Sequence, residues 1–454
     1  MIQVCKNIFF TCLLFFTFFA QNIYSQNNEI DFSEKKSLSA SQIEEKKEGG
    51  YFTGAAGPAA SPDAGFGGGI LLLYFYNGYK DNPLFAYTPY LLNLAFVANY
   101  QSKGLLNLGS IIDIPYIFNT NFRFRSELWY NSSPVTQYFG KGSSTLRKLQ
   151  DPYGNNFENL NDYNNQLRSV NNNGFTDAFY NYYKMKEFIY VETIQRSFSG
   201  GKWQILGGLS INHYDISDYS GQKITFTSQT GNKVSAVMNT TRLKSDYQKN
   251  LITGFNGGWM NGVYLGAGYD TRDLEPFPRN GMFHDVTALF YTPVLGSAQR
   301  FSTITTTARF YNSPFSFADL VFAERISYTL RNGNVPFYGH SHIFFTDRLS
   351  TSMANMRGFL DQRFIDNQMF IMNFELRYTF FHTTAFNQTF DYSFAPFIDT
   401  ITLPSKEIPL TKLLFRSSYG AGIRITWNQA TVICFDYGMS NEGSGLYILI
   451  RHIY

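Results

Sequence analysis

The chain has 454 residues, a formal net charge of +3, 18% aromatic and 16% charged residues, and a mean hydropathy of −0.21. So small a net charge argues against a nucleic-acid partner or a polybasic contact with a membrane surface. The charged share lies below the usual value of about 25%, and no segment after the first residues is long and apolar enough for a membrane-crossing helix. Many aromatic residues with few charges are typical of a transmembrane β-barrel.

Residues 1–25 are predicted to be a secretory signal peptide. An apolar run, residues 8–20, follows a basic residue and precedes a polar stretch, with cleavage expected after Ser25. A membrane anchor would need about 20 apolar residues, and a lipoprotein would need a cysteine at the cleavage site, whereas Cys12 lies inside the apolar run. After cleavage Cys434 is the only cysteine, so neither a disulfide framework nor a thiolate metal site is expected.

Residues 26–50 are predicted to form a disordered or weakly helical periplasmic tail, because they are polar and charged without apolar periodicity. A segment of about 25 residues is too short to bury a core of its own. No soluble domain is therefore expected before the barrel, which is predicted to occupy residues 51–454.

The rest of the chain reads as a succession of strands with turn signals between them. Fifteen segments can be delimited: 64–76, 91–102, 104–113, 118–130, 183–198, 201–214, 260–271, 281–292, 299–312, 315–330, 368–382, 388–399, 412–426, 429–438 and 445–454. Barrels made of one bacterial chain have an even number of strands, short periplasmic turns and long outer loops. Fifteen is odd, so one strand is missing from this count. Counted back from the C-terminus, tight and long connections alternate as far as residue 118, so the missing strand is expected nearer the N-terminus, at residues 51–56. The predicted fold is all-β, a transmembrane antiparallel β-barrel of 16 strands with an extracellular loop folded inward.

The stretch 369–381 shows the alternation most clearly. Phe370, Phe374 and Tyr378 fall on one face of the expected strand, and Glu375 and Arg377 fall on the other. In a membrane barrel the apolar face meets lipid and the polar face, charges included, lines the lumen.

Four connections are long, at 131–182, 215–259, 331–367 and 400–411, and they are rich in Asn, Gly, Ser and Tyr. They are predicted to be solvated surface loops. No specific motif within them indicates a ligand site.

A first motif ends one expected strand, forms a periplasmic turn and begins the next. Asp270, Arg272 and Asp273 are predicted to form a small ion network at the inner rim of the barrel. Pro278 and the Asn-Gly pair that ends at Gly281 supply the turn chemistry.

A second motif, Met356-Arg357-Gly358-Phe359, is followed by the strand that contains Glu375-Leu376-Arg377-Tyr378. This order and spacing resembles the bacterial surface antigen superfamily, the BamA/TamA-like assembly and translocation barrels of the outer membrane. Phe397-Ile398-Asp399 and the segment 137–142, which holds Phe139-Gly140, match further elements of that family. The sequence departs from the family pattern at position 356 and at residues 400–401.

The resemblance implies a lumenal latch formed by Arg357, Gly358, Phe359, Glu375 and Asp399. In the family, the loop with the Arg-Gly-aromatic motif folds into the barrel, and its arginine meets acidic groups on the two following strands. Alternation places Glu375 on the polar face of its strand, and a guanidinium away from bulk water needs carboxylate partners. The glycine would let the loop turn where a side chain would clash. The alternative is a solvated arginine on an outer loop, with an unrelated glutamate nearby.

The last residue, Tyr454, is an aromatic ending of the kind that the barrel-assembly machinery reads in related proteins, although His452 interrupts the apolar alternation before it. An enzymatic function is not expected, because the six histidines show no metal-ligand spacing. His340 and His342 would face one side of a strand, but they lack nearby carboxylates, so no metal or cofactor is predicted.

The expected protein is a bacterial outer-membrane barrel that assists insertion or translocation of proteins, through a weak seam between its first and last strands. It is expected to lack the POTRA-type periplasmic repeats that receive unfolded clients in the family. Its expected partners are the outer-membrane lipid bilayer, the barrel-assembly machinery during biogenesis, and unfolded client proteins or a periplasmic or lipoprotein subunit. Two other functions stay open: a passive or plugged channel, and a surface adhesin or structural barrel that acts through its long loops.

Overall fold

The computed structural model describes residues 30–32, 37–275, 277–315, 319–340, 342–344, 349–351, 356–385, 388–405, 409–427 and 431–450. The predicted signal peptide, residues 1–25, and the C-terminal Tyr454 lie outside these ranges. No helix in the part of the chain so described is both long and apolar enough to cross a membrane.

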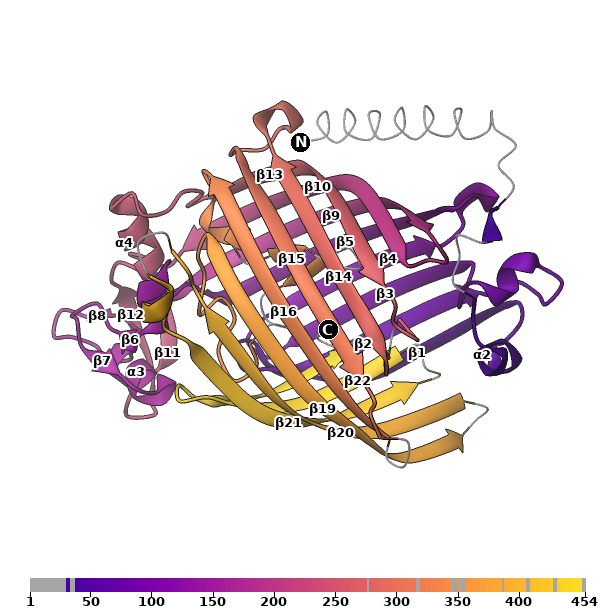
Figure 1. Cartoon of the computed structure of the whole chain (residues 1–454). Coiled ribbons are helices and arrows are strands. Elements are labelled where there is room, and N and C mark those ends of the chain that lie inside the picture. Colours follow the sequence, from indigo (N-terminus) through magenta and orange to yellow (C-terminus); the bar gives the residue numbers. More distant parts are fainter. Residues whose placement is uncertain are drawn as a thin grey trace.

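One antiparallel sheet of 16 strands forms the wall of a barrel (Figure 1). In sheet order, the strands are β1 (Gly50–Ser61), β2 (Gly65–Tyr76), β3 (Leu92–Gln101), β4 (Leu106–Ile114), β5 (Phe122–Gln137), β9 (Tyr182–Phe198), β10 (Trp203–Asp218), β13 (Gly257–Asp270), β14 (Gly281–Tyr291), β15 (Phe301–Asn312), β16 (Leu320–Gly333), β19 (Gln368–Ala385), β20 (Gln388–Thr402), β21 (Arg416–Trp427), β22 (Thr431–Met439) and β23 (Ser444–Ile450). The predicted strand count is confirmed, and β1 is the strand that loop parity had placed near residues 51–56.

The period-2 pattern becomes an inner and an outer face of the wall. On β19, Glu375 and Arg377 are buried, whereas Phe374 and Tyr378 on the opposite face are 40% and 46% exposed. The register of β19 against β20 shifts between Thr379 and Phe381. The bulge leaves two neighbouring aromatic residues of β19 exposed, because it breaks the alternation locally.

The longest connections lie at one end of the barrel. The turn between β9 and β10 spans residues 199–202, whereas the connection between β5 and β9 spans 138–181 and that between β16 and β19 spans 334–367. Because long connections mark the outer end of such barrels, β1 begins and β23 ends at the periplasmic end.

Two of the long loops fold together instead of remaining solvated, and we call residues 138–181 and 219–256 the outer cap. The cap contains β6 (Leu149–Gln150), β7 (Asn156–Phe157), α3 (Leu160–Leu167), β8 (Phe175–Thr176), β11 (Lys223–Thr227), β12 (Lys233–Met238) and α4 (Arg242–Gln248). Strands β11, β12 and β8 form a small sheet beside the barrel mouth (Figure 1). Tyr163, Leu167 and Met238 belong to a buried apolar cluster within the cap. The prediction of solvated loops is wrong here, because short strands and helices of about two turns leave little periodic signal in an Asn-rich sequence.

An apolar cluster also lies inside the outer part of the barrel. A buried cluster joins wall residues of β9, β10, β13 and β14 to side chains from α4 and from the 3₁₀ helix η6 (Phe337–His340). Tyr214 of β10 stacks on Tyr338 with ring centroids 4.4 Å apart, and Tyr138 meets Phe337 edge to face at 5.7 Å. Near the outer end the inward face therefore carries apolar side chains that pack against the loops, beside a few buried polar groups such as Glu187 and Arg331.

The polar segment before β1 is docked at the periplasmic rim. It includes helix α2 (Ala40–Glu45), and Lys46 Nζ donates to the carbonyls of Phe85 and Thr88 at 2.7 and 2.8 Å. The backbone N–H of Leu38 donates to Ala86 O at 2.8 Å. These contacts attach residues 37–50 to the β2–β3 connection, which contains η2 (Pro83–Ala86).

The remaining short elements lie in connections between wall strands. They are η3 (Ile117–Asn119), η4 (Ser143–Leu146), η5 (Pro293–Leu295), β17 (His342–Phe344), β18 (Leu349–Thr351) and η8 (Leu410–Lys412).

The cap core predicts that Met238→Ala loosens the cap while the barrel stays folded. Met238 is 1% exposed, and removing a buried methionine side chain costs about 2–5 kcal/mol. Amide hydrogen exchange in residues 219–238 should accelerate, while the heat-modifiable electrophoretic mobility of the barrel stays unchanged. Val170→Ala, at a cap position 42% exposed, serves as the control. Unchanged exchange in Met238→Ala would show that the cap does not depend on this core.

Candidate functional site

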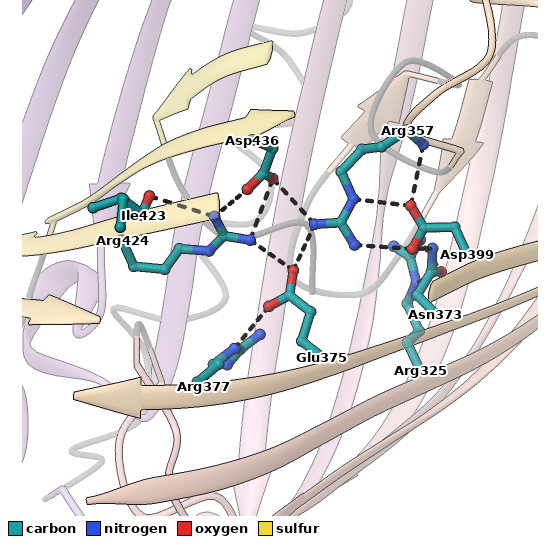
Figure 2. A network of polar contacts seen from close by, with 9 residues as sticks. All are labelled: Arg325, Arg357, Asn373, Glu375, Arg377, Asp399, Ile423, Arg424 and Asp436. Atoms are coloured by element: carbon teal, nitrogen blue, oxygen red, sulfur yellow. Dashed lines mark hydrogen bonds and ion pairs between the residues drawn. The ribbon is translucent and has the colours of Figure 1, made fainter. Parts of the chain in front are cut away.

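Arg357 lies inside the barrel and contacts three carboxylates on three different strands (Figure 2). Its Nε and Nη2 donate to Asp399 of β20 at 2.8 and 2.9 Å. Its Nη1 donates to Glu375 of β19 at 2.7 Å and to Asp436 of β22 at 3.0 Å. All four side chains are fully buried. The structure thus brings together the arginine and the two acidic residues singled out in the sequence, and it adds Asp436.

Further arginines brace the same carboxylates from the wall. Arg424 of β21 donates to Glu375 at 2.8 Å and also bonds Asp436, and Arg377 donates to Glu375 at 2.9 Å. Three guanidinium groups (357, 377 and 424) therefore face three carboxylates (375, 399 and 436), so the formal charges of this core of the network balance. Balance matters because an unpaired buried charge costs several kcal/mol. We call these six residues the charge network.

A second layer of contacts fixes the orientation of Asp399. Asn373 Nδ2 donates to Asp399 Oδ1 at 2.8 Å, and Arg325 of β16 donates to Asn373 Oδ1 at 2.7 Å (Figure 2). The guanidinium of Arg357 also stacks over the ring of Phe397, 3.3 Å from its centroid. The arginine thus has in-plane carboxylate partners and an aromatic face, which suits its planar geometry.

Gly358 allows the loop to press against the last hairpin. Its φ is +90°, and a Cβ there would lie 2.9 Å from the backbone carbonyl of Met439. A Cβ on Gly438 would in turn lie 2.7 Å from Gly358 N. The Tyr447 hydroxyl accepts the Gly358 N–H at 2.8 Å and donates to Phe359 O at 3.0 Å. Two glycines and one tyrosine therefore let two backbones meet closely.

Phe359 anchors the loop through apolar contacts. Its ring lies 5.0 Å from that of Phe364, and both belong to a buried cluster with Met356 and with Met369 and Ile371 of β19. The loop is thus held by charge on one side of Arg357 and by apolar packing on the other.

Sequence reasoning missed Asp436, Arg424, Gly438 and Tyr447 as members of this site. A signal for two of them existed, because Arg424 lies on the polar face of its strand and Asp436 interrupts an apolar alternation. Which lumenal charges would meet could not be read from one strand at a time, because the partners lie on four strands.

A family model described as the Omp85 superfamily domain matches residues 114–444. The chain belongs to the Omp85 superfamily. The resemblance inferred from the Arg357 motif and the Glu375 strand is thereby confirmed at the level of the superfamily, and the protein is a bacterial outer-membrane β-barrel. A second model, a domain of unknown function (DUF5982), matches residues 28–91, which include the docked segment and β1 and β2.

Solved structures similar to this Omp85 barrel share little sequence with it. BamA from Haemophilus ducreyi lacking POTRA domains 1–3 is 12% identical with a TM-score of 0.47, and the match covers 89% of this chain and 69% of that one. CdiB from Escherichia coli is 11% identical with a TM-score of 0.45, covering 88% of this chain and 59% of that one. CdiB from Acinetobacter baumannii is 11% identical with a TM-score of 0.43, covering 89% and 60%. No protein among the curated sequences matches.

The rim motif of the Omp85 barrel forms a turn at the periplasmic end. Arg272 binds Asp270 through two hydrogen bonds of 3.0 and 2.7 Å. The Asp273 carboxylate accepts backbone N–H groups of its own turn, from residues 274, 279 and 280, a contact that the sequence did not indicate. Pro278 lies in this turn. Gly281 has a φ of +105°, and a Cβ there would lie 2.3 Å from Thr271 O.

The two candidate histidines do not share a strand face. His340 ends η6 and is buried, whereas His342 begins β17. Burial and the nearby Arg331 lower the pKa of His340 to about 3, so this imidazole stays neutral at ordinary pH. Within the described ranges, no three or more His, Cys, Asp or Glu residues are grouped so that they could hold a metal ion.

The charge network predicts that Arg357→Ala destabilises the barrel by about 3–5 kcal/mol, because it leaves buried carboxylates without their shared cation. Arg357→Lys should cost less, since it keeps the charge but loses the two-bond contact with Asp399. Urea unfolding in lipid vesicles, followed by heat-modifiable mobility, measures the difference. Arg300→Ala, at an exposed outer position, should change stability by less than about 0.5 kcal/mol. An Arg357→Ala barrel as stable as this control would rule out the network as a stabilising element.

Proposed function

We propose that this Omp85 barrel assists insertion or translocation of proteins at the outer membrane by opening between β1 and β23. The observation that carries the proposal is how the two ends of the 16-stranded sheet meet. Every other neighbouring pair of wall strands is joined by a hydrogen-bonded ladder, and the sheet order begins with β1 and ends with β23. No ladder joins these two strands within the residues that the structure describes.

The composition of β1 also supports a weak seam. Pro58 has no N–H to donate, and proline in a sheet is found on edge strands. In the ladder with β2, Gly57 pairs with Gly69 and Pro58 pairs with Gly68. Pairs without side chains add little cross-strand packing, and each glycine in a strand costs about 0.5–1 kcal/mol relative to alanine. The first hairpin is therefore easier to deform than the rest of the wall.

The opposite side of the seam is stiff by comparison. The charge network ties β19, β20, β21 and β22 together through Arg357, Glu375 and Asp436. Strand β23 is the next strand after this braced region and is paired to β22 from Ile433 to Met439. This contrast favours movement of β1 and β2 away from β23 over distortion of the network.

A passive channel is less consistent with the outer mouth. The buried apolar cluster that contains Tyr138, Tyr214 and Tyr338 packs η6 and the cap against the inner wall beneath the cap. An aqueous solute would have to displace this packing. Lateral passage through the seam leaves it intact.

A second candidate function is recognition at the cell surface by the outer cap. The cap has its own apolar core, so it presents a defined shape, with Tyr153 70% and Leu251 59% exposed. Replacing both by serine should abolish binding of cells or surface ligands if the cap acts as an adhesin, and should leave insertion activity unchanged.

Clients of an insertion machine need a receiving surface in the periplasm. Omp85 barrels generally work in the outer membrane with other assembly or partner proteins. A periplasmic or lipoprotein subunit would supply that surface here, and the docked segment of residues 37–50 lies at the rim where it would bind.

A disulfide across the seam tests the function. A Cβ on Gly445 would lie 3.1 Å from Pro62 Cβ, close to the separation of about 3.5–4.5 Å that disulfides need. The double variant Pro62→Cys with Gly445→Cys should cross-link β23 to the turn after β1 when oxidised. In proteoliposomes the oxidised barrel should lose its acceleration of the folding of an unfolded eight-stranded outer-membrane barrel, and reduction should restore it.

Each single cysteine variant is the control, because it carries the same local change without the cross-link. The native Cys434 is buried and does not interfere. Full activity in the oxidised double variant would exclude the seam as the route.

A further inference from the structure

We propose that residues 358–363 form a clasp across the outer end of the seam, which holds the first hairpin to the last one and must release before the seam opens. The clasp is a device of the function proposed above and rests on it. Its members contact the β22–β23 hairpin on one side and the β1–β2 turn on the other.

On the side of the last hairpin the contacts are numerous. Ser440 Oγ donates to Gly358 O at 2.7 Å, in addition to the contacts of Gly358 with Tyr447. Arg363 binds Glu442 through two hydrogen bonds of 2.8 and 2.9 Å, and Arg416 of β21 donates to Glu442 at 2.7 Å. Glu442 is 6% exposed. A buried carboxylate shared by two arginines fixes this hairpin to the loop.

On the side of the first hairpin one contact is decisive. The backbone N–H of Asp361 donates to Asp63 Oδ1 at 3.0 Å, across 298 residues of sequence. Asp63 lies in the three-residue turn between β1 and β2. Beside it, Pro62 leaves no room for a side chain at Gly445, the second residue of β23. The loop therefore spans the seam at a point where the turn after β1 and the start of β23 are packed tightly together.

The loop cannot follow both hairpins when they separate. Arg357, immediately before the clasp, is bound into the charge network of β19 to β22. Movement of β1 and β2 away from β23 must therefore break the bond between Asp361 and Asp63 first. The hydrogen bond between Asp361 and Asp63 ties the loop to the first hairpin, whereas Gly358 and Arg363 tie it to the last hairpin through several hydrogen bonds and an ion pair, so the clasp is stronger on the side of the last hairpin.

The chemistry of the releasable side makes it sensitive to protonation. Burial and the neighbouring Asp361 raise the pKa of the half-buried Asp63 to about 7, while Lys103, which donates to Pro62 O at 2.9 Å, opposes this shift. Arg168, Tyr182 and Tyr447 also lie within electrostatic range of this group of charges. In an open seam Asp63 is solvated and ionises near its usual value of about 4.

The direction of the pH effect follows from the pKa of Asp63 in the closed and in the open seam. A closed state whose carboxyl pKa is raised binds protons more tightly than the open state, so acid favours closure. Between about pH 4 and pH 7 the ionisation of Asp63 progressively favours opening, and above about pH 7 this effect is complete.

Hydrogen exchange of the full chain in lipid nanodiscs tests the clasp without any client. Asp63→Ala removes the acceptor and should lower the protection of amides in residues 57–61 and 444–446 at least about tenfold at pH 5.5. Asp63→Asn keeps an acceptor oxygen but removes the charge. It should stay protected from pH 5.5 to pH 8, whereas the native barrel loses protection as pH rises, after correction for intrinsic exchange.

Asp162→Ala, at an exposed position on α3, is the matched control and should behave as the native barrel. Two results would overturn the clasp: native protection in Asp63→Ala, or a pH dependence of protection in Asp63→Asn as large as in the native barrel. The asparagine variant keeps the test decisive if the alanine variant fails to fold. A barrel that shows the expected exchange but no insertion activity would refute the proposed function and leave the clasp supported.

Discussion

A guanidinium removed from water needs carboxylates around it, and this requirement shapes the interior of the barrel. Transfer of one charge into a low-dielectric site costs several kcal/mol unless partners and hydrogen bonds compensate. Arg357 meets the requirement with Glu375, Asp399 and Asp436, which come from three wall strands. Satisfying one arginine therefore fixes the registers of those strands relative to one another, and it fixes the depth at which the loop enters the lumen.

The loop that carries Arg357 then becomes a structural centre. Gly358 and Gly438 let it touch the last hairpin, Phe359 packs under the outer end of β19, and Arg363 reaches Glu442. The cap also rests on it, because Gly142 donates to Ile365 O at 2.9 Å and Arg363 donates to Thr145 O at 2.6 Å. The outer closure of the barrel and the bracing of its wall are thus parts of one packed unit.

The first hairpin lies outside this unit, and the difference has a simple origin. The outer half of this hairpin is rich in glycine, so it offers few side chains to pack there, and Pro58 of β1 lacks an N–H to donate. A barrel wall with one stiff region and one weak strand at the end of its sheet concentrates deformation at the junction between them. We infer that function uses this contrast, with the loop between Gly358 and Arg363 as the part that crosses the junction.

The sequence by itself determined the barrel, its sixteen strands and the inward direction of Glu375 and Arg377, because a period of two residues assigns each side chain to a face wherever a strand forms. It also indicated Arg357 as a lumenal residue, through a motif shared with a family. Only the tertiary structure decided that Arg424 and Asp436 join the site, that Asn-rich loops build an apolar cap, and that Asp361 meets Asp63. Alternation states which face a residue occupies, whereas contacts between strands and loops hundreds of residues apart depend on how the closed wall brings them together.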